Sequence, residues 1–198
     1  MANFPKYKML DRVVPANRQW PDKVLTKPPV WASVDLRDGN QALPIPMDPP
    51  RKLQYFKMLT EIGFKEIEVS FPSASQDDFA FTRKLIEDHL IPDDVKISVL
   101  TQSREHLIRR TVESLQGVKQ AILHLYVPTS DLHGKFVLGQ SRDVLLKTAV
   151  EGTRMVRDLL GEAGLLGKVG YEFSPEEFTD TDPQFAVDIC TPVKEPSG

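Results

Sequence analysis

The segment Ser33–Gln41 holds the densest group of side chains that could do chemistry. It reads Ser-Val-Asp-Leu-Arg-Asp-Gly-Asn-Gln and combines two carboxylates, a guanidinium and two amides. Asp38 could bind a hard divalent cation through oxygen, and Arg37 could stabilise an oxyanion that develops during a reaction. The competing interpretation is a tight Asp-Gly turn with a surface salt bridge, and the residue types alone favour it.

Glu68 lies in segment 66–69, Glu-Ile-Glu-Val, which is expected to form the second strand. A buried carboxylate needs a partner, and Arg37 is the candidate that we expect. The alternative is a surface pair between Glu68 and Lys65.

Three more polar residues stand in or after later strand-like segments. His124 lies within the apolar run 121–127, and a lone histidine in a strand is more often a satisfied core residue than a ligand or base. Ser174 and Glu176 follow the segment 168–173. Because Ser174 and Glu177 have the spacing of a capping box, this segment could equally begin a helical turn.

Strand and helix patterns alternate along the chain and must position these residues. Strands are expected at 30–36, 66–69, 95–100, 120–127 and 168–173. Helix starts are expected at Asp48, Ser75, Ser103, Ser141 and Pro183, with Gly63 ending the first helix and Pro192 the last. Five strand–helix repeats predict a parallel sheet with right-handed crossovers. Either a doubly wound open sheet or part of a (β/α)8 barrel fits, although a whole barrel typically needs about 250 residues.

The candidate residues share a position as well as a type. Arg37, Asp38, Glu68, His124, Ser174 and Glu176 all fall in or just after the C-terminal halves of predicted strands, where barrel enzymes gather their catalytic groups. The chain has neither a G-x-G-x-x-G nor a P-loop motif, and it has no His-x-His or His-x-x-x-His pair. A dinucleotide or nucleotide site of the standard kinds is therefore unsupported.

Composition excludes several other classes of protein. The 198 residues are 40% apolar, with 25 basic against 28 acidic side chains and no basic block, so we expect no nucleic-acid partner. The longest apolar runs are too short to span a membrane. A single cysteine suits a reducing compartment. The start of the chain has no apolar signal segment, which favours a cytoplasmic location without excluding a mitochondrial one.

The expected domain organisation has three parts. Residues 1–29 form an extended, proline-rich leader, residues 30–190 the barrel portion, and residues 191–198 a tail.

Three longer motifs make the chain resemble a known family. Segments 35–41, 63–75 and 171–176 closely resemble the 2-isopropylmalate synthases in their fungal-like form, members of the α-isopropylmalate/homocitrate synthase family. Segments 17–21 and 102–108 agree with this resemblance, which runs from about residue 17 to about residue 190. It implies an α/β fold that is the N-terminal part of a catalytic (β/α)8 TIM barrel, with about five βα units.

The resemblance also implies a reaction and a set of roles. Acetyl-CoA would condense with 2-oxoisovalerate in a Claisen-type reaction that forms a C–C bond and yields 2-isopropylmalate, the entry to leucine biosynthesis. A divalent metal (Mg, Mn or Zn) would polarise the oxo acid. The matching positions are Arg37 and Glu176 as catalytic residues, Asp38 as a metal ligand, and, for substrate binding, Glu68, Leu100, His124 and Ser174.

The sequence departs from the family after the fifth strand. The family's histidine ligands form a His-x-His on a later strand, which this chain does not contain. We therefore expect an incomplete metal site, and a homodimer or a complementing synthase polypeptide as partner. Two alternatives stay open: a catalytically impaired partner of a full-length paralogue, and a relative that uses another 2-oxo acid in a specialised pathway. A five-stranded flavodoxin-like domain fits the length but not the motifs.

Overall fold

A computed structural model of the protein describes residues 27–194, and in them strands and helices alternate. Residues 1–26 of the predicted leader and 195–198 of the predicted tail lie outside the described residues. The elements in chain order are β1 (Ala32–Ser33), α1 (Pro49–Ile62), β2 (Glu66–Ser70), α2 (Gln76–Glu87), β3 (Lys96–Gln102), α3 (Glu105–Ser114), β4 (Ala121–Pro128), α4 (Arg142–Glu162), β5 (Val169–Glu176) and α5 (Pro183–Lys194).

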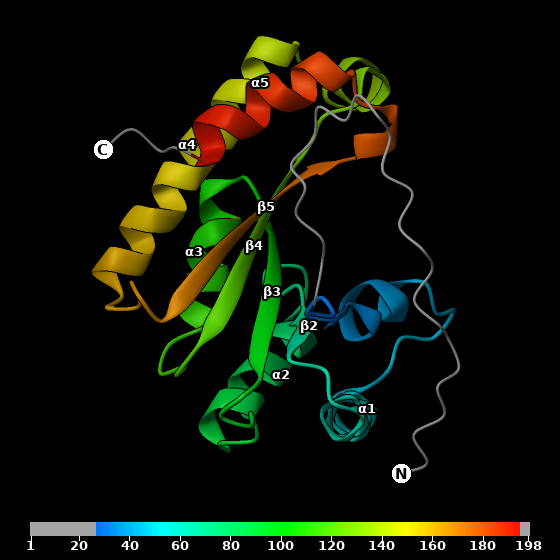
Figure 1. Cartoon of the computed structure of the whole chain (residues 1–198), viewed down its shortest axis with the longest axis vertical. Helices are drawn as coiled ribbons and strands as arrows, with labels where there is room; N and C mark the ends of the chain where they lie inside the picture. Colours follow the sequence, from blue (N-terminus) through cyan, green and yellow to red (C-terminus); the bar gives the residue numbers. More distant parts are fainter. Residues whose placement is uncertain (1–26, 195–198) are drawn as a thin grey trace, which may run out of the picture.

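The five strands form one parallel sheet in the order β1-β2-β3-β4-β5 (Figure 1). Each strand pairs with the next one along the chain. A doubly wound sheet would instead reverse its order at a switch point. The sheet is therefore a half-barrel of five βα units, which confirms the predicted partial TIM barrel and excludes the doubly wound alternative.

The apolar core lies between this sheet and its helices. Contacts run in sequence from α1 to α2, α3, α4 and α5, so the helices form a continuous outer layer. Ile67, Val99 and Leu123 are fully buried against that layer. Because side chains alternate along a strand, the neighbouring residues Glu68, Leu100 and His124 belong to the opposite, inner face.

Local sequence signals explain most element boundaries. The Asp48 carboxylate accepts a hydrogen bond from the Arg51 N–H, and Gly63 ends α1 with φ of 110°. The Ser75 hydroxyl accepts from the Asp78 N–H and caps α2. Ser103 does not cap α3, contrary to the prediction. Its hydroxyl donates to the Thr148 carbonyl at 2.7 Å, which joins α4 to the end of β3.

The first strand is shorter than expected. After β1, residues Asp35–Gly39 turn into a single wide helical turn, in which the N–H groups of Arg37 and Asp38 donate to the Val34 carbonyl. Leu36 is completely buried and anchors the turn against the core. The expected strand 30–36 was wrong outside Ala32–Ser33. Its last residues belong instead to the turn, because the Val34 carbonyl accepts the turn's hydrogen bonds.

The end of β5 does not form the helical turn that the Ser174–Glu177 spacing could have begun. The strand continues to Glu176, so Ser174 and Glu177 form no capping box. Pro175 explains this, because the residue before a proline is disfavoured in the helical region. Asp182 is the residue that caps α5, accepting from the Gln184 and Phe185 N–H groups.

Helix α5 does not stop at Pro192, which corrects the prediction that a tail begins at residue 191. The helix runs through Pro192 to Lys194. Proline removes one hydrogen bond from a helix interior, but Val193 beyond it is only 4% exposed and packs in a cluster with Phe185 and Ile189. This apolar burial offsets the lost hydrogen bond. Within residues 27–194, no helix has both the length and the apolar character to cross a membrane.

Candidate functional site

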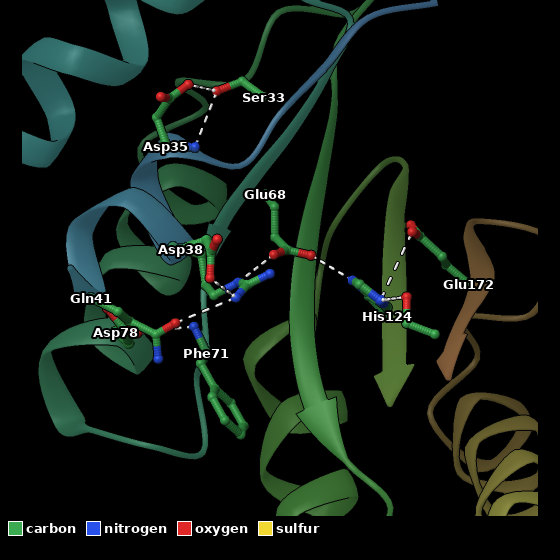
Figure 2. A network of polar contacts seen from close by, with 11 residues as sticks. Ser33, Asp35, Asp38, Gln41, Glu68, Phe71, Asp78, His124 and Glu172 are labelled. Carbon is green, nitrogen blue, oxygen red and sulfur yellow. Dashed lines mark hydrogen bonds and ion pairs between the residues drawn. The ribbon is translucent and has the colours of Figure 1, made fainter. Parts of the chain in front are cut away.

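The predicted residues from four strands meet at the C-terminal edge of the sheet. A cavity of about 360 Å³ opens there on the inner face. Six of the seven residues singled out from the sequence line it. The seventh, Glu68, is buried and lies between Arg37 and His124, with a hydrogen bond to each. Figure 2 shows Glu68 beside His124. The complete lining is Arg37, Asp38, Gln41, Phe71, Leu100, His124, Tyr126, Ser174 and Glu176.

Arg37 is held over the cavity by three partners. Its Nε donates to Glu68 Oε1, and its Nη1 donates to Asp38 Oδ1 at 2.7 Å and to Gln41 Oε1 at 3.3 Å. The expected Arg37–Glu68 pair is thus confirmed, and Lys65 pairs with Asp94 instead. Among residues 27–194, the two N–H groups on Nη2 have no hydrogen-bond partner. A guanidinium has five donors, so these two are available to an oxygen atom in the cavity.

Glu68 links Arg37 to His124. Burial alone would raise the pKa of Glu68, but the hydrogen bond from His124 and the positive charge of Arg37 outweigh it, so the pKa lies below its ordinary value. Glu68 is therefore an ionised acceptor at neutral pH. One oxygen serves each partner, which satisfies the carboxylate in a site where it is only 4% exposed.

His124 continues this chain of contacts to β5. Its Nδ1 lies 2.6 Å from Glu68 Oε2, and its Nε2 lies 2.6 Å from Ser174 Oγ. An ionised carboxylate only accepts hydrogen bonds, so the proton of a neutral imidazole belongs on Nδ1. Nε2 then accepts from the Ser174 hydroxyl. His124 is satisfied, as the core interpretation expected, yet it also lines the cavity.

Glu176 stands at the end of β5 on the cavity's rim. Desolvation by the surrounding protein raises its pKa, and the neighbouring charge of Glu177 adds to that shift against the opposing effects of His133 and Arg37. A carboxyl group whose pKa is shifted upward is better suited to accept and release a proton near neutral pH.

Sequence reasoning missed two aromatic residues of the cavity wall. Tyr126 and Phe71 form an edge-to-face pair with ring centroids 6.2 Å apart. Tyr126 follows His124 by two residues on β4, so the alternation of strand side chains could have placed it on the same face. Phe71 directly follows β2, and nothing in its local pattern distinguishes it from a core residue.

The described residues offer a metal ion one carboxylate rather than a full set of ligands. Asp38 is 63% exposed and one of its oxygens is already bound by Arg37. Within residues 27–194, no three His, Cys, Asp or Glu side chains are grouped so that they could hold a metal. A transition-metal site normally needs three protein ligands. The residues present therefore do not fit a complete site, and no reaction step is assigned to a metal.

In TIM-barrel enzymes the active-site side chains gather at the carboxyl ends of the strands, and this partial TIM barrel gathers its polar side chains at the same edge. The chain belongs to the HMGL-like family, which matches residues 29–197. It is 55% identical to a 2-isopropylmalate synthase of Schizosaccharomyces pombe, 52% to one of Saccharomyces cerevisiae and 50% to one of Clostridium acetobutylicum, each over 96% of this chain. These results confirm the resemblance that the sequence motifs indicated.

This chain covers only part of the length of each of these relatives. The chain covers 33%, 31% and 34% of those three synthases, respectively, so it spans about a third of their length. A crystal structure of the HMG-CoA lyase of Bacillus subtilis has a TM-score of 0.59 at 18% identity, covering 85% of this chain and 55% of the lyase. That likeness supports the half-barrel fold.

Proposed function

We propose that this chain forms the oxo-acid and oxyanion side of a 2-isopropylmalate synthase active site. The reaction is the condensation of acetyl-CoA with 2-oxoisovalerate, followed by hydrolysis of the thioester by water to give 2-isopropylmalate and CoA, a step of leucine biosynthesis. The observation that carries the proposal is the Arg37–Glu68–His124–Ser174 network, which three strands and the turn after β1 bring to one cavity. The identity of 50–55% to proteins named for this activity supports it.

Six of the residues that line the cavity then have a role. The two N–H groups on Nη2 of Arg37 donate to the oxygen that becomes negative as the new C–C bond forms. Ser174 and His124 line the side of the cavity that receives the oxo acid, and Leu100 forms an apolar wall beside its alkyl group. Glu176, with its raised pKa, takes a proton from the acetyl methyl group. Asp38 would supply one ligand to a divalent metal, and the remaining ligands would have to come from outside residues 27–194.

We further propose that another polypeptide segment, from a second copy or from a complementing synthase chain, covers the β5 edge. In the described residues β5 pairs only with β4, which leaves one row of backbone groups available for pairing. An apolar cavity of about 520 Å³ between α4, β5 and α5 adjoins this edge and includes Val156, Leu160 and Phe173. Light scattering of the purified chain tests this: a monomer that binds no synthase polypeptide contradicts it. A single cysteine suits a reducing compartment, which favours the cytoplasm with the mitochondrion as the alternative, and cell fractionation distinguishes the two locations.

Substrate binding and turnover test the proposed function separately. The purified chain should bind 2-oxoisovalerate in calorimetry, and Arg37→Gln should weaken binding at least about tenfold, since a charge-assisted hydrogen bond contributes about 1.5 to 3 kcal/mol. Arg109→Gln is the matched control, because Arg109 lies on the exposed side of α3 and, among residues 27–194, pairs only with Glu105. Condensation is measured as product mass with a panel of 2-oxo acids, for the chain alone and with a complementing synthase polypeptide. A folded chain that neither binds 2-oxoisovalerate nor forms a condensation product overturns the proposal.

A further inference from the structure

Glu68, His124 and Ser174 are connected in the order of a catalytic triad. The imidazole is in the middle, with the carboxylate 2.6 Å from Nδ1 and the serine hydroxyl 2.6 Å from Nε2. The relevant signature of an activated nucleophile is a hydroxyl within hydrogen-bond reach of a base that a third group orients. This signature is recognised by the geometry of the three groups and does not depend on the fold that carries them.

The surroundings supply the remaining requirements of such a site. Ser174 lines the 360 Å³ cavity, so its oxygen is accessible to a small acyl group. Arg37 lines the same cavity, and its two Nη2 donors have no partner within residues 27–194. They are available to the oxyanion of a tetrahedral intermediate. Arg37 also holds the second oxygen of Glu68, which keeps the carboxylate ionised and the proton of His124 on Nδ1.

A second cluster of the same residue types shows why the order matters. Near the end of β4, Ser130 Oγ donates to Glu177, and His133 Nδ1 lies 3.3 Å from the other oxygen of that carboxylate. Here the carboxylate is in the middle, so no imidazole can take the serine proton. Ser130 also lies outside the lining of the cavity. The two clusters form a natural pair of test and control.

The geometry points to Ser174 as a nucleophile that gives this cavity an acyl-thioester hydrolase activity, with His124 as its base and Glu68 as the residue that orients the base. This inference rests on the proposed function only for the identity of the acyl donor, acetyl-CoA or a related thioester.

The steps balance as a simple hydrolysis. Ser174 Oγ attacks the thioester carbonyl carbon while its proton passes to His124 Nε2. The C–S bond breaks, and the thiolate leaves with that proton as a free thiol. Water then attacks the acyl-serine, a proton again passes through Nε2 to Ser174 Oγ, and the carboxylic acid is released. The net reaction consumes one thioester and one water and yields one acid and one thiol.

Covalent labelling of the full 198-residue chain tests the nucleophile directly. A fluorophosphonate probe should modify the wild-type chain once, and peptide mass spectrometry should locate the adduct at Ser174. Ser174→Ala should abolish the labelling, whereas Ser130→Ala should leave it unchanged. His124→Gln should slow it by at least about 10²-fold, because it removes the base. Glu68→Gln should also slow it, since an amide that donates to Nδ1 moves the imidazole proton to Nε2, the wrong tautomer for a base.

Hydrolysis of acetyl-CoA without any 2-oxo acid provides a second measurement. Release of the free thiol should exceed the buffer rate and should be lost in Ser174→Ala. A folded wild-type chain that is not labelled, or that carries the label elsewhere, overturns the inference, and so does thiol release that survives Ser174→Ala. Because these assays contain no oxo acid, their failure is distinct from a failure to bind or condense 2-oxoisovalerate.

Discussion

Glu68 and His124 are in direct hydrogen-bond contact although a whole strand separates them. Glu68 is on β2 and pairs in register with Ser98 of β3, while His124 is on β4 and pairs with Leu100. Strands are about 4.8 Å apart, so the two side chains meet across β3 on the inner face, 2.6 Å apart. The small side chain of Ser98 next to Glu68 leaves space for this contact.

Glu68→Gln should destabilise the chain by about 1 to 3 kcal/mol. Arg37 and His124 both donate to Glu68, whereas glutamine has one acceptor oxygen and no charge to balance the guanidinium. Chemical denaturation of both forms at pH 7 measures the difference. The matched control is Glu66→Gln on the same strand, because Glu66 makes no side-chain hydrogen bond among the described residues, so it should change stability little. Equal effects of the two substitutions would contradict the role given to Glu68.

The stability difference between the wild-type chain and Glu68→Gln should depend on pH. Because the pKa of Glu68 is lower in the folded chain than the ordinary 4.5, the carboxylate's contribution is fully present above that value. It is lost as the pH falls through the folded pKa. Denaturation curves at pH 7 and at successively lower pH should therefore show the two proteins converging. A difference that grows on acidification would contradict an ionised Glu68.

Ser98→Ala should be neutral or stabilising, by up to about 1 kcal/mol. The Ser98 hydroxyl is buried on the inner face and has no hydrogen-bond partner within residues 27–194. Removing it eliminates a desolvated polar group without leaving another group unpaired. Ser70→Ala is the contrasting substitution, since the Ser70 hydroxyl lies 2.6 Å from Thr82 Oγ1 in a buried contact. It should cost about 1 kcal/mol. The melting temperatures of both variants measure this contrast, and a loss of stability in Ser98→Ala would indicate an unrecognised partner.

The parts of this site that could be predicted are those that depend on local pattern. Alternating strands and helices placed Arg37, His124 and Ser174 at one edge of a parallel sheet, because all strands in such a sheet end on the same side. Pairing Arg37 with Glu68 came from the rule that a buried carboxylate needs a cation. None of this required the register between strands.

The His124 contacts with Glu68 and Ser174 could not be predicted from the sequence. They depend on which residues of β2, β3, β4 and β5 lie side by side, and β2 carries a bulge between Glu68 and Ser70 that shifts its register with β3. The same holds for Ser103, whose position before α3 resembles a cap but whose hydroxyl reaches α4, a contact between residues 45 positions apart. Long-range packing decides such cases, and a single sequence carries no local signal for it.

Gly152 is the residue of α4 that allows this helix to approach the end of β3. A methyl group there would overlap the Ser103 hydroxyl and lie 3.3 Å from Leu125 Cδ2. Gly152→Ala should therefore destabilise the chain, by about 1 to 3 kcal/mol for an overpacked core, despite alanine's better helix propensity. Ser103→Ala removes the overlapping oxygen, so the double variant should recover part of the loss. A double-mutant cycle measures this coupling. If the effects of the two substitutions simply add, the methyl group at position 152 does not clash with the Ser103 hydroxyl.

Glu176→Gln should make the chain more stable at neutral pH while impairing the proposed condensation. Desolvation raises the pKa of Glu176 above the ordinary 4.5, so the folded state binds this proton more tightly than the unfolded state does. The corresponding stability is present below 4.5 and lost as the pH rises through the folded pKa. A neutral glutamine avoids that loss, and its melting temperature should exceed that of the wild-type chain at pH 7 and match it at pH 4. Glu61→Gln on α1, at an exposed position, is the control for removing a surface carboxylate. A Glu176→Gln variant that is less stable at pH 7 would mean that the carboxylate is stabilised in the folded chain, contrary to its role as a proton acceptor.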